Sequence, residues 1–166
     1  MSSPVVVKAV RWKLRSRLEG VKVSMNISTK GRYALSYLTD LAMQETNAPL
    51  SVKESAEHCG ISEKYLEQIV GTLQKNQIIR SVRGSHGGYY LATKPDECTV
   101  GKVLRVMEGS LNIAPCLIDE GRMCERRESC SNLVLWKKMD EALSSVIDNV
   151  TIADMCIWKK GEVVHV

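Results

Sequence analysis

The sequence lacks any long apolar run. No stretch approaches the roughly 20 consecutive apolar residues of a membrane-spanning helix, so we expect no association with a membrane. The first residues also lack the apolar segment and the small-residue cleavage site of a secretory signal. We therefore expect a cytoplasmic protein whose six cysteines are reduced thiols rather than a disulfide framework.

The usual signatures of an enzyme are also missing. The chain has no Cys-x-x-Cys motif, no evident pairing of a nucleophile with a base, and no phosphate-binding glycine loop outside one hairpin tip. It shows no internal repeat and no low-complexity tract. With 166 residues, 44% of them hydrophobic and 25% charged, it is typical of one ordinary globular domain. We predict that it is neither an enzyme nor a cluster carrier.

The net charge of +4 is concentrated at one end of the chain. Residues 1–24 hold six basic residues and one acid, so the rest, with 17 basic and 18 acidic residues, has a net charge of −1. Bulk charge therefore does not identify a nucleic-acid binder. We interpret residues 1–24 as a basic extension upstream of a second start at Met25. A DNA-contacting arm and a docked amphipathic helix are the alternatives.

Three helices are expected next. Apolar residues at helical spacing follow Thr29, a possible N-cap, and residues 47–49 end that element. Ser51 and Glu54 match a capping box that opens a short second helix. Gly60 suits a tight turn, and Ser62 caps a third helix with apolar residues at Leu66, Ile69, Val70 and Leu73.

A β-hairpin follows the helices. Residues 78–82 and 89–92 alternate with a period near two, around a glycine-rich tip at 83–88. Three helices and a hairpin predict a mainly α fold with a small β-hairpin wing, a winged helix-turn-helix. We divide the chain into this DNA-binding unit at 25–95, a connecting helix and cysteine loop at 96–130, and a dimerisation helix with a tail at 131–166.

The last long helix carries an apolar stripe that must be buried. Its members lie three or four residues apart: Leu133, Trp136, Met139, Leu143, Val146, Ile147 and Val150. The flank of the domain itself is one possible cover, but a second copy of the helix suits so long a stripe better. We therefore expect a homodimer.

The DNA-reading residues should begin at Ser62, because a helix-turn-helix places the start of its second helix in the major groove. Gln68 can pair with adenine and Glu67 can accept from cytosine, each pair discriminating by about 1–3 kcal/mol. Lys64 and Tyr65 suit phosphate contacts, and Arg83 in the hairpin tip suits the minor groove. A merely solvated helix face is the alternative.

Three cysteines lie in a charged loop where there is little apolar surface to join. Cys116, Cys124 and Cys130 have seven and then five residues between them. Clustered thiols in such a loop indicate an iron–sulfur site, which normally takes four protein ligands. The fourth is open among Cys98, Cys156, Asp119, Glu120, Glu125, a side chain of a partner subunit and an exogenous molecule. Zinc is disfavoured because no Cys-x2–4-Cys knuckle is present, and free or redox-active thiols are a further alternative.

Four motifs carry a resemblance to a known family. Residues 25–35, 61–68, 82–84 and 87–89 closely resemble the Rrf-type winged-helix transcription regulators, in particular their IscR-like iron–sulfur branch. The resemblance implies a homodimeric repressor or activator that binds a double-stranded DNA operator. It also implies that Ser62, Tyr65, Glu67, Gln68 and Arg83 contact DNA.

The same resemblance implies an iron–sulfur cluster, 2Fe–2S rather than 4Fe–4S, supplied by the iron–sulfur assembly machinery. The regulated genes would then be those of cluster biogenesis. Cluster-free members of the family lack the cysteines. Leu133 stands where IscR-like relatives have a histidine ligand, and the first cysteine spacing is seven residues where five is usual. A thiol-switch or zinc-binding regulator of the same fold is the alternative function.

Overall fold

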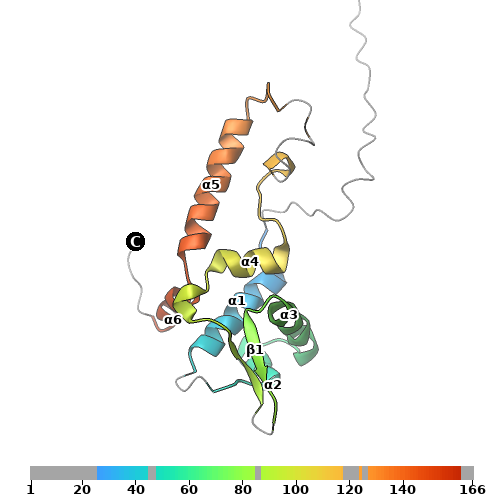
Figure 1. Cartoon of the computed structure of the whole chain (residues 1–166), viewed down its shortest axis with the longest axis vertical. Coiled ribbons are helices and arrows are strands. Elements are labelled where there is room, and N and C mark those ends of the chain that lie inside the picture. The colour runs from blue at the N-terminus through green and yellow to red at the C-terminus, as the bar shows by residue number, and fades with distance from the viewer. Residues whose placement is uncertain (1–25, 45–47, 85–86, 118–123, 125–126, 162–166) are drawn as a thin grey trace, which may run out of the picture.

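The computed structural model describes residues 26–44, 48–84, 87–117, 124 and 127–161. The basic extension at 1–24 lies outside these residues, as do Asp119, Glu120 and Glu125. The elements, shown in Figure 1, are α1 (Thr29–Ala42), α2 (Val52–Cys59), α3 (Glu63–Lys75), β1 (Ile79–Val82), β2 (Gly88–Leu91), the 3-10 turn η1 (Pro95–Glu97), α4 (Val100–Glu108), the 3-10 turn η2 (Pro115–Leu117), α5 (Leu133–Asn149) and α6 (Ile152–Lys159). The expected mainly α fold with a β-hairpin is confirmed. Within the described part of the chain, no helix combines the length and apolarity needed to cross a membrane.

Most helix starts follow from local sequence. The capping box at α2 is present, because Ser51 Oγ accepts from the Glu54 amide at 3.2 Å and Glu54 accepts from the Ser51 amide at 3.1 Å. Ser62 and Thr99 cap α3 and α4 as predicted. The prediction of Thr29 as the α1 cap was wrong. Ser28 is the cap, because its extended backbone lets its hydroxyl accept from the Gly31 amide.

Helix α1 lies at the centre of the core. Its Tyr37 and Leu38 are fully buried and pack with Leu66 of α3, Ile79 of β1 and Ile152 of α6. The helix therefore contacts α3, α4, α6 and the hairpin together. Burying these apolar side chains stabilises the unit by about 1.5–3 kcal/mol for each large residue.

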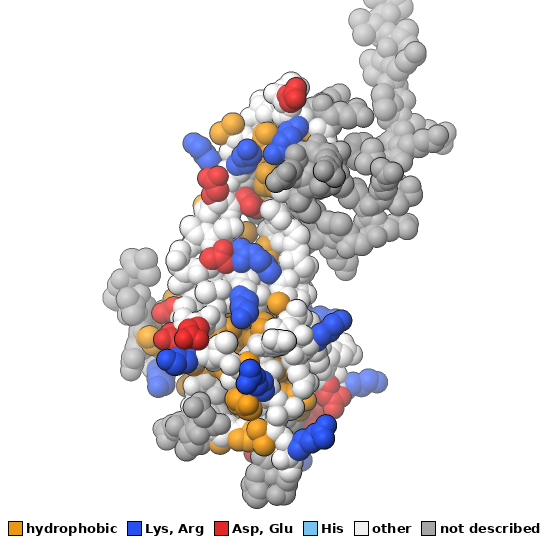
Figure 2. Space-filling model, viewed as in Figure 1, with side chains coloured by type: hydrophobic (Ala, Val, Ile, Leu, Met, Phe, Trp, Pro, Cys, Tyr) orange, Lys and Arg blue, Asp and Glu red, His pale blue; other side chains and the backbone are white. Residues whose placement is uncertain are grey.

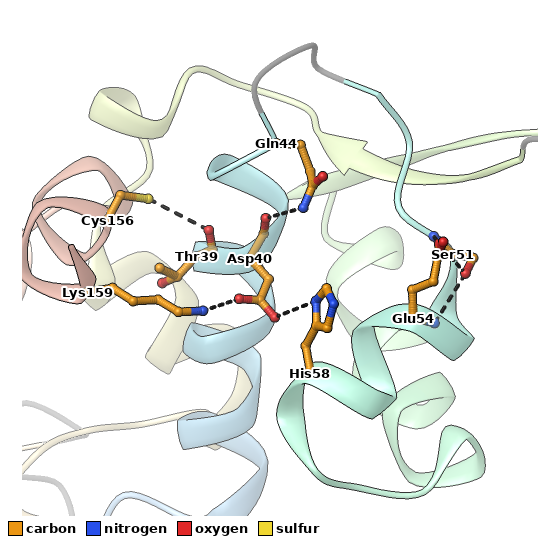
Figure 3. Close-up of polar contacts among 8 residues, drawn as sticks. All are labelled: Thr39, Asp40, Gln44, Ser51, Glu54, His58, Cys156 and Lys159. Carbon is orange, nitrogen blue, oxygen red and sulfur yellow. Dashed lines mark hydrogen bonds and ion pairs between the residues drawn. The ribbon is translucent and has the colours of Figure 1, made fainter.

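Helix α6 is held on α1 by polar contacts around Asp40, whose side chain is 7% exposed. Figure 3 shows the carboxylate of Asp40 between Lys159 of α6, which donates to it, and His58 of α2, whose Nδ1 lies 3.6 Å away. The Cys156 thiol donates to the Thr39 carbonyl across a 3.7 Å distance. Burying a carboxylate requires such partners, so α1, α2 and α6 are joined at this point.

Helix α5 extends away from the other helices (Figure 1). Its C-terminal half is fixed to α4 by a bidentate pair between Arg105 and Asp148, with N···O distances of 2.5 and 2.8 Å, and by apolar contacts of Ile147. Ile147 is its one buried residue. Much of the remaining apolar surface is uncovered: Val134 is 64% exposed, Leu135 51%, Leu143 38% and Val146 60%. Figure 2 shows hydrophobic side chains reaching the surface among the charged ones on this part of the molecule.

Candidate nucleic-acid interface and cysteine loop

The turn between α2 and α3 sets the direction of the predicted DNA-reading helix. Gly60 has φ 65° and ψ 35°, a left-handed conformation that glycine adopts at little cost. The next amide, that of Ile61, donates to the Ala56 carbonyl at 3.1 Å and closes the turn. Ser62 then caps α3 through the Tyr65 amide at 3.3 Å. These local bonds fix the point at which α3 begins.

The two faces of α3 differ sharply. Its inner face buries Leu66, Ile69, Val70 and Leu73 in the core. The predicted DNA-binding residues Ser62, Lys64, Glu67 and Gln68 are all exposed on the other side, and Tyr65 is half-buried. The Tyr65 ring packs edge-on against Tyr33 of α1, with ring centroids 6.1 Å apart and an interplanar angle of 86°. The structure thus gathers these five residues at the exposed start of one helix.

The wing is fixed beside α3. In the hairpin, Ile79 pairs with Leu91 and Val82 with Gly88. Gln74 of α3 donates to Ser81 of β1 at 3.3 Å, which joins helix and strand. Arg83 is exposed and follows β1 directly, so it lies at the outer end of the hairpin. An exposed guanidinium there has the freedom to follow a nucleic-acid groove.

The start of the cysteine loop is bonded to α5, and the two described ends of the loop are bonded to each other. The carboxylate of Asp140 in α5 accepts from the Ile113 amide at 3.3 Å and from the Asn112 side chain at 3.4 Å. Further along, Arg127 donates to the Cys116 carbonyl at 2.7 Å. These contacts close the loop that carries the thiols.

The donor chemistry of the loop fits three ligand positions of an iron–sulfur cluster. Cys116, Cys124 and Cys130 are half-buried thiols, and thiolates are the usual cluster ligands. Among the described residues, however, no three His, Cys, Asp or Glu side chains converge on one point. The three cysteines therefore do not form a preassembled metal pocket.

Two of the proposed fourth ligands are too far away within one chain. Cys98 is fully buried in the core, and its carbonyl accepts from the Ile152 amide at the start of α6. Cys156 lies in α6 itself. The 17 residues of α5 separate α6 from the loop, which is roughly 25 Å at 1.5 Å per residue. Figure 1 shows α6 at one end of α5 and η2, where the cysteine loop begins, near the other.

Burial sets the chemistry of the other thiols. It raises the pKa of the Cys98, Cys59 and Cys156 thiols, with the nearby Asp40 carboxylate adding to the rise at the last two. These thiols are thus held protonated and unreactive. Cys98 is fully buried in the core and packs there as a structural residue.

Several contributing residues had no local signal in the sequence. Glu108, Asp140 and Arg127 make the contacts that join the loop, α5 and α1 across 80, 27 and 11 residues. Helical spacing and cap patterns report neighbours within about four residues. Identifying these three residues requires knowing which distant positions lie in contact in the folded chain.

Comparison with known proteins places these features in a family. Residues 27–157 match the model of Rrf2, described as "Iron-dependent Transcriptional regulator". CymR of Bacillus subtilis, an HTH-type transcriptional regulator, is 38% identical over 138 residues, or 83% of this chain and 94% of CymR. Its solved structure, titled the global cysteine regulator, has a TM-score of 0.67 at 36% identity and covers 80% and 97% of the two chains.

Regulators named IscR are similarly related. IscR of Erwinia tasmaniensis is 36% identical over 131 residues, covering 79% of this chain and 78% of that protein. The solved structure of T. potens IscR has a TM-score of 0.65 at 34% identity and covers 89% and 96% of the two chains. Sequence identity and structural similarity are thus nearly the same for the relatives named CymR and for those named IscR.

Proposed function

From the premise that this chain belongs to the Rrf2 family of winged-helix, DNA-binding transcription regulators, and is not an enzyme, we propose that its DNA binding responds to an iron–sulfur cluster. Cys116, Cys124 and Cys130 would hold that cluster, preferentially a 2Fe–2S cluster. The regulated genes would be those of cluster biogenesis.

One observation carries the proposal. The three thiols lie in a loop that is anchored to α5 and joined by Arg127 to the Cys116 carbonyl. Three soft donors in one closed loop suit iron–sulfur ligation. The near-equal similarity to CymR and IscR does not separate a cluster-responsive function from a cluster-free one, and the three thiols of the loop support the first.

The fourth ligand would come from outside the folded core. Cys98 and Cys156 lie at the far end of α5, which leaves Asp119, Glu120, Glu125, a partner's side chain or an exogenous molecule. A weak fourth ligand suits a sensor, because such a cluster is easily lost. A bound cluster would supply the redox- and iron-sensitive chemistry, while the chain's own residues read DNA.

For DNA recognition we propose direct roles for α3 and the wing. Gln68 and Glu67 would read base edges in the major groove, and Lys64, Tyr65 and Ser62 would fix the register on phosphates. Arg83 would enter the adjacent minor groove. Their exposure at the start of α3 and beyond β1 supports this assignment.

The active unit would be a homodimer formed through α5. The uncovered Val134, Leu135, Leu143 and Val146 supply the apolar surface for a second copy. Two copies would place two α3 helices in successive major grooves, about 34 Å apart. The operator would then contain two inverted half-sites.

The test is an anaerobic absorption spectrum of protein reconstituted with iron and sulfide. We expect visible sulfur-to-iron charge-transfer bands with matching iron and sulfide content. Cys116→Ser should remove the bands, whereas Cys156→Ser, a matched change of a half-buried cysteine, should leave them intact. A featureless visible spectrum in wild-type protein would refute the cluster.

A metal-free thiol switch is the second candidate. It is favoured by the finding that the three thiols do not converge in the described structure. In that case a featureless spectrum would accompany operator binding that changes with a mild thiol oxidant. Loss of that response in Cys116→Ser would then assign the switch to this loop.

A further inference from the structure

Glu108, the last residue of α4, reaches across to the start of α1. Its carboxylate accepts from the Ser28 amide at 3.0 Å and from the Ser28 hydroxyl at 2.7 Å. Ser28 is the N-cap of α1, which has no acidic residue in its own first turn. Glu108 thus places a negative charge at a helix N-terminus, where charge-assisted hydrogen bonds and the helix dipole both favour it.

The sequence of α1 leaves room for this carboxylate. Gly31 is buried, and a Cβ atom built on it would lie 2.4 Å from Oε1 of Glu108. The nearest other atoms, 3.2 Å away, belong to the side chains of Ile27 and Leu104. Any larger residue at this position would displace the carboxylate from Ser28, so glycine permits the contact.

On one side, Glu108 leads directly into the cysteine loop. Gly109 ends α4, and Asn112 and Ile113 are then held by Asp140 of α5. Cys116 follows, with its carbonyl bound by Arg127. The segment from Glu108 to Cys116 is therefore bonded to α5 and to Arg127. We expect a rearrangement of the thiols to shift this segment and with it the Glu108 carboxylate.

On the other side, the contact lies beside the DNA-reading helix. Ser28 and Glu108 line one hollow together with Tyr65 in the first turn of α3. Tyr65 also packs on Tyr33 of α1. A shift of the α1 start relative to Glu108 would therefore reach the turn of α3 that carries Ser62–Gln68.

We propose that the Glu108–Ser28 contact couples the cysteine loop to α3, with Glu108 acting as a positioning residue for DNA recognition. This inference rests on the proposed function, because it describes how the state of the loop changes operator affinity. A coupling contact must matter differently in the two states of the loop. Its measure is the ratio of operator Kd between cluster-loaded and cluster-free protein.

The experiment compares this ratio in dimeric, full-length variants, on an operator selected from random DNA. For the wild type we expect a ratio of about 5–150, the usual range for coupled sites. Glu108→Ala should bring it towards 1, and Glu108→Gln, which keeps the acceptor oxygen, should restore part of it. Gly31→Ala should lower the ratio as well, because it displaces the carboxylate without removing it. Glu97→Ala, which removes an exposed acid in η1, is the matched control and should keep the wild-type ratio.

A second readout needs no cluster. In cluster-free Glu108→Ala, amide hydrogen exchange at Gly31 and at residues 62–68 should rise several-fold, while exchange at Ile147 stays unchanged. A purely structural role would lower stability and raise exchange throughout, but leave the Kd ratio intact.

The outcomes separate the two claims. A wild-type ratio of 1 would refute cluster-responsive DNA binding, and the coupling with it. A wild-type ratio well above 1 that persists in both Glu108→Ala and Gly31→Ala would refute the coupling alone. If Glu108→Ala does not fold, the Kd ratios of Glu108→Gln and Gly31→Ala test the coupling. Wild-type ratios in both would refute it.

Discussion

The helix-turn-helix unit and the α5 region of this regulator are built in opposite ways. In the first, α1, α3 and the hairpin share one core with fully buried residues such as Leu38 and Leu66. In the second, α5 buries Ile147 and leaves Val134 and Val146 more than half exposed. The first unit is complete within one chain. The second leaves apolar surface exposed and three thiols that do not converge, and we propose that a second chain and a cluster complete it.

This difference separates the two tasks of a regulator. A DNA-reading helix must hold its side chains rigidly, because each misplaced base contact loses affinity. A responsive region must have two arrangements of similar free energy. We infer that the dense core fixes α3, while the loop, whose three thiols do not converge, carries the response.

The largest contrast should come from matched leucine truncations in the two regions. Leu66→Ala should lower the free energy of unfolding by about 2–5 kcal/mol, because it leaves a cavity in the core. Leu135→Ala, at a residue 51% exposed, should change it by no more than about 0.5 kcal/mol in the dissociated monomer. Urea unfolding at low protein concentration measures both. Equal losses would contradict the proposed difference in packing.

Thiol reactivity should divide the six cysteines in the same way. Cys98 is fully buried and burial raises its pKa, so its reactive thiolate is scarce and shielded. Because the shift is upward, its alkylation should begin at higher pH than in the unfolded chain. In cluster-free protein at pH 8 we expect Cys98 to react at least ~100-fold more slowly than Cys116, Cys124 and Cys130, as followed by mass spectrometry. Similar rates would show that the core opens readily.

Base reading should depend on α3 in a position-specific way. Gln68→Ala should weaken operator binding by about 1–3 kcal/mol and relax the preference at one base pair. Lys64→Ala should weaken binding to all sequences alike and lower the salt dependence. Binding titrations on single-base operator variants distinguish the two. If Gln68→Ala weakened binding to all operator variants equally, Gln68 would contact the DNA phosphates rather than a base.

The smallest expected effect concerns assembly. Val146→Lys places a charge in the proposed dimer surface and should raise the dimer dissociation constant by about tenfold, or 1.4 kcal/mol. Lys137→Glu, at an exposed position of α5 that lies about two and a half turns before Val146 and so on the opposite side of the helix, serves as the charge-change control. Sedimentation velocity over a dilution series gives both constants. An unchanged dimer dissociation constant in Val146→Lys would show that the dimer interface does not include this part of α5.

Local patterns in the sequence predicted the local structure well. The caps at Ser51, Ser62 and Thr99 and the left-handed Gly60 were all readable, because each acts within about four residues. The α1 cap was misplaced by one residue, although the bond that makes Ser28 the cap is local and runs from the Gly31 amide to the Ser28 hydroxyl. What the local pattern could not reveal is the second partner of that hydroxyl, Glu108, which lies 80 residues away. The apolar stripe of α5 was readable only in part: Leu143 and Val146 belong to the predicted stripe and are exposed, whereas the exposed Val134 and Leu135 lie outside it. The sequence also does not reveal what covers these residues.

The candidate site was predictable only in part. The thiols of the loop and the exposed face of α3 were visible as residue types and spacing. The exclusion of Cys98 and Cys156 as ligands within one chain required the length and direction of α5. The contacts of Asp140 and Arg127 with the loop required the fold itself.

The central claim is that the state of the cysteine loop controls DNA binding. It is tested most directly by the operator Kd of the wild-type dimer, measured anaerobically with the cluster loaded and again after its removal. We predict that the two constants differ by at least about fivefold, and that Cys116→Ser binds like the cluster-free protein under both conditions. Equal constants for the loaded and cluster-free wild type would contradict the account.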